Sequence, residues 1–134
     1  MSLVSESHSA DQDAQLLAQI QTDLSAATCL LSELPRGVTV FGSARTAPDD
    51  AAYQCAERLG TWLGRAGLPV LTGGGPGIME AVNRGAREAD GISVGLNIEL
   101  PYEQTPNPHL THQLHFHHFS TRKLMLTHIG RAHV

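Results

Sequence analysis

The sequence has no apolar run long enough to cross a membrane, and its first residues do not resemble a signal peptide. A membrane-spanning helix needs about 20 predominantly apolar residues, and the 134-residue chain contains no such segment. The opening segment MSLVSESHSADQD has neither the basic start nor the apolar stretch of a secretory signal. We therefore expect a cytoplasmic protein that does not associate with membranes.

Cysteine and positive charge are also scarce. The two cysteines, Cys29 and Cys55, fall in predicted helices and do not have the spacing of a metal site. We expect them to be buried, free thiols in a reducing compartment. The formal net charge of -4 argues against a protein that coats nucleic acid or an anionic membrane. Any site for an anion must therefore depend on a local group of cations.

What the chain does contain is the composition of an ordinary globular domain and an apolar helical stripe near its start. The sequence is 41% hydrophobic and 16% charged. We expect a polar tail over residues 1–12 and one domain over residues 13–134. Apolar residues at alternating steps of three and four, beginning at Leu17, predict a first helix over residues 13–34. Its stripe should pack on its own domain, with packing on a partner helix as the alternative.

Strand and helix patterns alternate through the rest of the chain. Short apolar runs predict strands at residues 37–42, 68–72, 92–96 and near 113–118. The predicted helices between them open at Pro48 and Pro76, and a closing helix is capped by Ser120 or Thr121. Alternation through short links indicates an α/β fold with a parallel sheet and right-handed crossovers.

Three loops at one edge of this sheet carry glycines or cations. Ligands of open parallel sheets bind at the carboxyl ends of the strands, where the sequence places GSAR (42–45), TGGGPG (72–77) and the turn that bears Arg122 and Lys123. Consecutive glycines before a helix N-terminus predict a site for an anion such as phosphate. The pattern is neither a dinucleotide fingerprint nor a Walker A loop, and a tight turn without a ligand is the alternative.

The position of Arg122 favours a functional role. It falls in the first turn of the closing helix, where the helix dipole disfavours positive charge. Its guanidinium would hold a phosphate or carboxylate beside the glycine turn, whereas Arg45 alone would be interpreted as a surface residue. His115 and His117 would share one face of a strand, but no cysteine or well-placed carboxylate completes a zinc set, so we predict no metal site.

Four segments resemble the Lonely Guy (LOG) family in their order and spacing. They are VFGSARTAPDD, VLTGGGPGIMEAVNRGA, GLNIELPYEQTPNPH and FSTRKLML, and the resemblance covers roughly residues 38–125. It implies a Rossmann-like, doubly wound parallel sheet in three α/β/α layers, and a homodimer or higher oligomer. It also implies hydrolysis, without a cofactor, of the N-glycosidic bond of a nucleoside 5′-monophosphate such as AMP or a cytokinin riboside monophosphate.

The resemblance also implies roles for particular residues. Arg122 matches the family's catalytic arginine, and the substrate- and phosphate-binding residues would be Gly42, Ser43, Arg45, Gly73, Gly74, Gly75, Gly77 and Lys123. The family was formerly labelled lysine decarboxylase. Pyridoxal phosphate chemistry needs a lysine for the Schiff base, and Lys123 beside Arg122 is the only lysine of the sequence. We therefore do not expect decarboxylase activity.

One family motif is missing. The family carries Pro-Gly-Gly-x-Gly-Thr-x-x-Glu after the next strand, which supplies the catalytic glutamate, and no Gly-Thr-x-x-Glu occurs here. Glu80 follows the glycine turn but is interpreted as a helix N-terminal acid. We expect a domain shortened on its C-terminal side, with a sheet that ends at its fourth strand and self-associates through a bare edge. The alternatives to a hydrolase are a nucleotide or cofactor carrier, similar to molybdenum-cofactor carriers, and an inactive oligomerising remnant.

Overall fold

The computed structural model of the chain describes residues 9–99 and 105–133. A single five-stranded sheet is built from β1 (Gly37–Thr39), β2 (Val70–Thr72), β3 (Ser93–Ile98), β4 (His112–Phe116) and β5 (Gly130–His133). The helices are α1 (Ala10–Ser32), α2 (Ala51–Arg65), α3 (Ile78–Glu88) and α4 (Phe119–Ile129). Every strand pair is parallel. The predicted α/β fold, of the Rossmann-like type, is therefore confirmed.

The strand order contains the change of direction that creates a binding crevice in this type of fold. The sheet runs β4-β3-β2-β1-β5, so the chain moves outward from β1 to β4 and then returns through α4 to the other side of β1. The prediction that the sheet ends at its fourth strand is wrong, because a fifth strand, β5, pairs with β1, with Thr39 opposite His133. In such sheets, ligands bind where strand order reverses, beyond the carboxyl ends of the strands.

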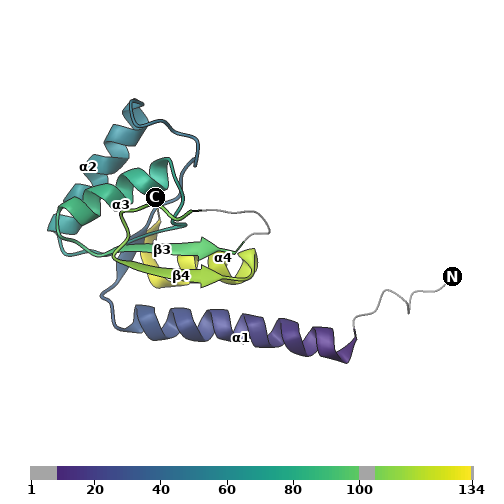
Figure 1. Ribbon diagram of the computed structural model, residues 1–134. Coiled ribbons are helices and arrows are strands. Elements are labelled where there is room, and N and C mark those ends of the chain that lie inside the picture. The colour runs from purple at the N-terminus through teal and green to yellow at the C-terminus, as the bar shows by residue number, and fades with distance from the viewer. Residues whose placement is uncertain (1–8, 100–104, 134) are drawn as a thin grey trace.

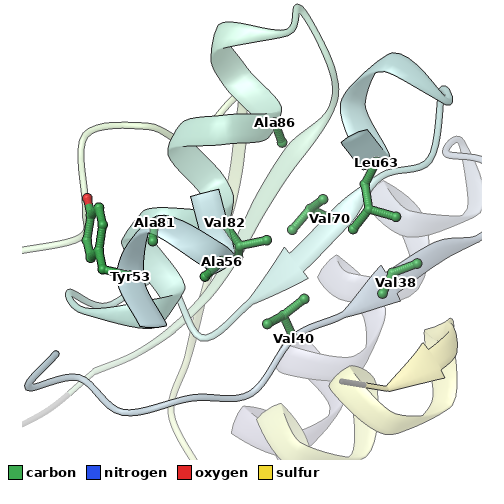
Figure 2. Close-up of a cluster of buried hydrophobic side chains, with 9 residues drawn as sticks. All are labelled: Val38, Val40, Tyr53, Ala56, Leu63, Val70, Ala81, Val82 and Ala86. Atoms are coloured by element: carbon green, nitrogen blue, oxygen red, sulfur yellow. The ribbon is translucent and has the colours of Figure 1, made fainter. Parts of the chain in front are cut away.

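Helices cover both faces of the sheet. Figure 1 shows α2 and α3 on one side of the strands and α1 along the other. On the α2/α3 side, Figure 2 shows the buried cluster formed by Val38, Val40, Tyr53, Ala56, Leu63, Val70, Ala81, Val82 and Ala86. On the α1/α4 side, a second cluster contains Ala27, Leu31, Leu71, Val94, Leu96, Phe116, Met125 and Leu126. The sheet is thus the middle of three layers.

The two clusters follow from the alternation of side chains along each strand. Val70 packs with α2 and α3, and the next residue, Leu71, packs with α1 and α4. Both are at most 1% exposed. Burying a side chain of this size contributes about 1.5–3 kcal/mol relative to leaving it in water, so short strands with continuous apolar runs are held in place from both faces.

The first helix begins earlier than predicted. Ser9 accepts a hydrogen bond from Gln12 N (3.1 Å), and the Gln12 side chain accepts one from Ser9 N (3.0 Å), which is a capping box. Residues 10–12 are therefore helical, in contrast to the predicted tail, whose residues 1–8 lie outside the described residues. Leu17, expected in the core, is 66% exposed, because the N-terminal half of α1 extends beyond the sheet (Figure 1).

Two other helices begin later than their prolines suggest. Asp50 caps α2 by accepting a hydrogen bond from Ala52 N (2.8 Å), so Pro48 precedes the helix. The helix α3 begins at Ile78, two residues after Pro76, because Gly77 stands before it with a φ of 72°. That left-handed conformation is not helical and favours glycine.

The cysteines are not buried as predicted. Both Cys29 and Cys55 are free and exposed. The buried face of α1 consists of Asp23, Ala27 and Leu31, which recur every four residues, and Cys29 falls outside this spacing. None of the described helices has the length and apolar character needed to span a membrane.

Candidate functional site

Two cavities adjoin each other at the carboxyl ends of the central strands. The turn cavity, of about 330 Å³, is lined by Ala44, Gly73, Gly74, Gly75, Pro76, Met79, Asn97, Ile98, Thr105, Pro106, His115, Phe119 and Arg122. The β1 cavity, of about 470 Å³, is lined by Val40, Phe41, Gly42, Gly73, Met79, Phe119, Arg122, Lys123 and Leu126. Arg122 and Gly73 line both, so these residues stand at the junction of one crevice.

Arg122 is fixed by two backbone carbonyls, one in β3 and one in the turn that follows β2. Its Nε donates a hydrogen bond to Leu96 O (2.6 Å) and its Nη2 donates one to Gly73 O (2.9 Å). Burial lowers the pKa of the Arg122 guanidinium, but a guanidinium stays protonated in proteins. Among the described residues, no carboxylate forms an ion pair with it. The crevice therefore contains a positioned, half-buried cation whose other N–H groups are available to a ligand.

The glycine turn, residues 73–75, is held by hydrogen bonds to its carbonyl oxygens. Gly73 O accepts from Arg122 (2.9 Å), Gly74 O accepts from Asn107 N (2.9 Å), and Gly75 O accepts from Asn107 Nδ2 (3.0 Å). Gly74 has a φ of 77°, and a side chain there would collide with Asn97. The turn thus requires glycine and is anchored on both of its sides.

A buried polar network beneath the turn was not predicted from the sequence. Thr72 Oγ1 donates to Asn83 Oδ1 (2.6 Å) and accepts a hydrogen bond from Gly74 N (2.9 Å). Asn83 Nδ2 in turn donates to Ser93 Oγ (2.8 Å), and Asn107 Nδ2 donates to Asn83 Oδ1 (3.2 Å). An asparagine among the apolar residues of a helix, as Asn83 is in α3, was the signal that could have indicated it.

Six of the nine predicted site residues line the crevice. Gly73, Gly74, Gly75 and Arg122 line the turn cavity, and Gly42 and Lys123 line the β1 cavity. They come from the loops after β1 and β2 and from the first turns of α4. The sequence prediction that these loops converge at one edge of the sheet is therefore matched by the geometry.

The other three, Ser43, Arg45 and Gly77, line neither cavity. Arg45 is exposed, and its backbone N donates to Ser43 Oγ (3.1 Å). Ser43 O accepts a hydrogen bond from Ile78 N (2.9 Å), and a side chain at Gly77 would collide with Ser43 O and with Ala44. In this structure the three residues join the loop after β1 to the start of α3.

The histidines do not share one strand face as predicted. The strand β4 ends at Phe116, so His115 lines the turn cavity whereas Nδ1 of His117 lies 2.6 Å from Asp23 Oδ1 on α1. Within residues 9–99 and 105–133, no group of three or more His, Cys, Asp or Glu side chains is arranged to hold a metal ion. Glu80 lies in the first turn of α3, as predicted, and lines neither cavity.

The predicted caps of the closing helix, Ser120 and Thr121, both lie inside α4. Asp23 of α1 takes over part of that role, because its carboxylate accepts hydrogen bonds from His117 N (2.8 Å) and Thr121 Oγ1 (2.9 Å) at the start of α4. A negative charge at a helix N-terminus is favourable. This carboxylate from another helix offsets the unfavourable position of the cations Arg122 and Lys123.

Comparisons with known proteins agree with this architecture. A model of the SLOG cluster4 family matches residues 35–117. The X-ray structure of TM1055 is 30% identical, with a TM-score of 0.61 over 74% of this chain and 59% of that one. A molybdenum cofactor carrier protein from Chlamydomonas reinhardtii is 24% identical, with a TM-score of 0.61 over 74% of this chain and 61% of that one. No curated protein matches the chain. The chain thus spans about three fifths of the length of these two neighbours.

Proposed function

Because the chain belongs to the SLOG cluster4 family, within the LOG-like proteins that its motifs predicted, we propose that its crevice binds a nucleoside 5′-monophosphate. The observation that supports this most directly is the half-buried guanidinium of Arg122, whose described partners are the carbonyls of Gly73 and Leu96 and no carboxylate. Burying a cation without a counter-ion is unfavourable. A phosphate would supply that counter-ion and accept two parallel hydrogen bonds from the guanidinium.

We propose further that the bound nucleotide is hydrolysed at its N-glycosidic bond. Water forms a bond to C1′ of the ribose, and the bond from C1′ to the base nitrogen breaks with its electron pair passing to the base. One proton of the water is transferred to the base, which leaves free base and ribose 5-phosphate. Positive charge develops on the ribose as the bond breaks, and a carboxylate would stabilise it.

The proposed hydrolysis needs a carboxylate that the described cavities do not provide. Neither the turn cavity nor the β1 cavity is lined by an Asp or Glu of the described residues. We therefore propose that the carboxylate comes from outside the described residues or from a second chain. In this arrangement Arg122 anchors the phosphate, and the glycine turn provides the close backbone approach.

A second candidate function is the binding of an anionic cofactor without hydrolysis. The same lack of a carboxylate in the described lining favours it. Two of the solved structures that the chain resembles carry the name molybdenum cofactor carrier protein from Chlamydomonas reinhardtii, the one above and a second that is 27% identical with a TM-score of 0.50. If this function is correct, Arg122 and the glycine turn hold the ligand, and we expect the bound ligand to be released unchanged.

Calorimetry and product analysis with AMP distinguish these functions. We expect the wild-type protein to bind AMP at least tenfold more tightly than adenosine, and Arg122→Gln to abolish that difference. Arg84→Gln is the matched control, because Arg84 pairs with Glu88 on the surface of α3 (3.1 Å) and lines neither cavity. Release of adenine supports hydrolysis, binding without release supports a carrier, and equal affinity for AMP and adenosine contradicts a site for the nucleotide phosphate at Arg122.

We also propose that the chain forms a homodimer or higher oligomer. The N-terminal half of α1 supports this, because Leu16 and Leu17 are 42% and 66% exposed and exposed apolar side chains on a projecting helix favour association. Light scattering coupled to size-exclusion chromatography measures the mass directly. A monodisperse monomer at high micromolar concentration would contradict the proposal.

A further inference from the structure

Three consecutive carbonyl oxygens of the glycine turn are all occupied by protein donors. Arg122 occupies Gly73 O, and Asn107 occupies the other two through its backbone N and its side-chain Nδ2. A carbonyl oxygen repels an anion, so a turn that binds phosphate through its backbone must direct its carbonyls elsewhere. Asn107 therefore satisfies the carbonyl oxygens of Gly74 and Gly75, as backbone N–H groups satisfy carbonyl oxygens within a helix.

The consequence for the N–H groups follows from the planarity of the peptide bond. The carbonyl of Gly74 and the N–H of Gly75 belong to one peptide group and point in opposite directions. When Asn107 N holds Gly74 O, the N–H of Gly75 is directed away from Asn107. Among the described residues, no atom accepts a hydrogen bond from Gly75 N, and Gly75 lines the turn cavity. This N–H is thus available to a ligand in the crevice.

The side-chain amide of Asn107 uses both its nitrogen and its oxygen in hydrogen bonds. It is 7% exposed, its Nδ2 donates to Gly75 O (3.0 Å) and to Asn83 Oδ1 (3.2 Å), and its Oδ1 accepts from His109 N (3.0 Å). A flipped amide would place its oxygen against two acceptors, so one orientation is imposed. Through Asn83 the amide is tied to Thr72 at the end of β2.

We propose that Asn107 is a positioning residue of the anion site. It orients the glycine turn so that the phosphate meets the N–H of Gly75 and the Arg122 guanidinium rather than carbonyl oxygens. This inference rests on the proposed function for the identity of the anion. Asn107 lies in the loop that also contributes Thr105 and Pro106 to the turn cavity. The same loop therefore forms part of the cavity wall and fixes the orientation of the glycine turn.

Asn107→Asp tests the donor role alone. The carboxylate keeps the size of the side chain and an acceptor for His109 N, but it cannot donate to Gly75 O or Asn83 Oδ1. Asn107→Ala removes the donor without adding a negative charge. Ser93→Ala is the matched control, because Ser93 bonds to Asn83 within the same buried network but makes no described hydrogen bond to the turn.

We expect both Asn107 variants to bind AMP at least tenfold more weakly with unchanged adenosine affinity, and Ser93→Ala to stay within twofold for both ligands. A purely structural role would lower the unfolding midpoint of all three variants without this selective loss. Wild-type AMP affinity in folded Asn107→Asp and Asn107→Ala would overturn the inference.

A measurement on the unliganded protein keeps this inference separate from the proposed function. If the wild-type protein binds no AMP, the proposed function fails, and amide hydrogen exchange then decides the positioning role. We expect the Gly74 amide, which donates to Thr72 Oγ1, to exchange at least tenfold faster in Asn107→Asp than in Ser93→Ala. Equal exchange in the two variants would show that Asn107 does not hold the turn.

Discussion

Asp23 of α1 accepts hydrogen bonds from both the backbone N–H and the ring of His117, 94 positions further along the chain, at 2.8 and 2.6 Å. Burial acts to raise the pKa of the Asp23 carboxyl, but hydrogen bonds from His117 and Thr121 outweigh it, so the pKa is lowered. The hydrogen bond that the His117 ring donates to Asp23 raises the pKa of the His117 imidazole, although burial opposes it. The pair is therefore most stable with both partners charged.

This pair predicts a stability maximum in weakly acidic solution. The raised pKa of His117 contributes stability that is fully present below its unfolded value of about 6.5 and is lost as pH rises through the folded value. The lowered pKa of Asp23 contributes stability that is present above its unfolded value of about 4 and is lost as pH falls through the folded value. We expect the urea midpoint to be highest between these limits and to fall on either side.

The Asp23→Asn variant isolates the pair from the other titrating groups. Glu99 also lies near the ring, with its Oε2 3.4 Å from His117 Nε2, and remains in the variant. We expect the difference in unfolding free energy between the two proteins to be about 1.5–3 kcal/mol at pH 5.5, as for hydrogen bonds to charged groups, and to shrink at pH 9. A difference that is constant from pH 3 to pH 9 would contradict the assigned pair.

Gly74→Ala is predicted to cost more stability than Gly67→Ala. Both glycines have a left-handed φ, 77° and 76°, which costs about 1–2 kcal/mol for an L residue. At Gly67 nothing lies within 4 Å of an added methyl group, whereas at Gly74 that group would collide with Asn97. Thermal unfolding of both variants measures the difference. Equal losses would mean that the Asn97 side chain moves aside freely.

Thr39→Val is predicted to destabilise the protein through one buried hydrogen bond. Thr39 is 0% exposed, and its Oγ1 donates to Leu126 O of α4 at 2.7 Å. The variant leaves that carbonyl without its donor, at a cost of about 1–3 kcal/mol. Thr28→Val is the matched control, because Thr28 makes a bond of the same 2.7 Å to Leu24 O on the exposed side of α1. Equal losses in denaturant unfolding would contradict this role for Thr39.

The local features of the sequence predicted the fold and the place of the site. Apolar runs and glycine stops mark strands and helices within a few residues, because both signals depend on neighbouring positions. The loop after β2 and Arg122 of α4 could be placed together, because parallel strands bring their carboxyl ends to one edge. The exact helix starts at Ser9, Asp50 and Gly77 depend on individual caps that compete with nearby alternatives.

The contacts that fix the site were not predictable, because they join distant segments. Asn83 and Asn107 are 24 positions apart and meet only when α3 and the loop before β4 pack at the end of β2. Asp23 had no sequence signal either, since it lies in a polar stretch of α1 and finds its partner His117 only across the α1/α4 side of the sheet. Such polar pairs follow from tertiary packing rather than from periodicity.

The motifs placed two arginines, Arg45 and Arg122, in the same predicted site, but only Arg122 lines the crevice in the structure. Arg122→Lys keeps the charge but loses the planar fork, so one ammonium cannot hold Leu96 O and Gly73 O and also face a phosphate. Arg45 is exposed and lines neither cavity, so Arg45→Lys changes little in the crevice.

We expect Arg122→Lys to weaken AMP binding by about tenfold or more, which corresponds to about 1.4 kcal/mol. We expect Arg45→Lys to stay within about twofold of the wild-type affinity, as for an exposed charge. Calorimetry at 150 mM salt, where long-range effects are screened over about 8 Å, measures both. If Arg45→Lys lost as much affinity as Arg122→Lys, the loop after β1 would have to close over the ligand.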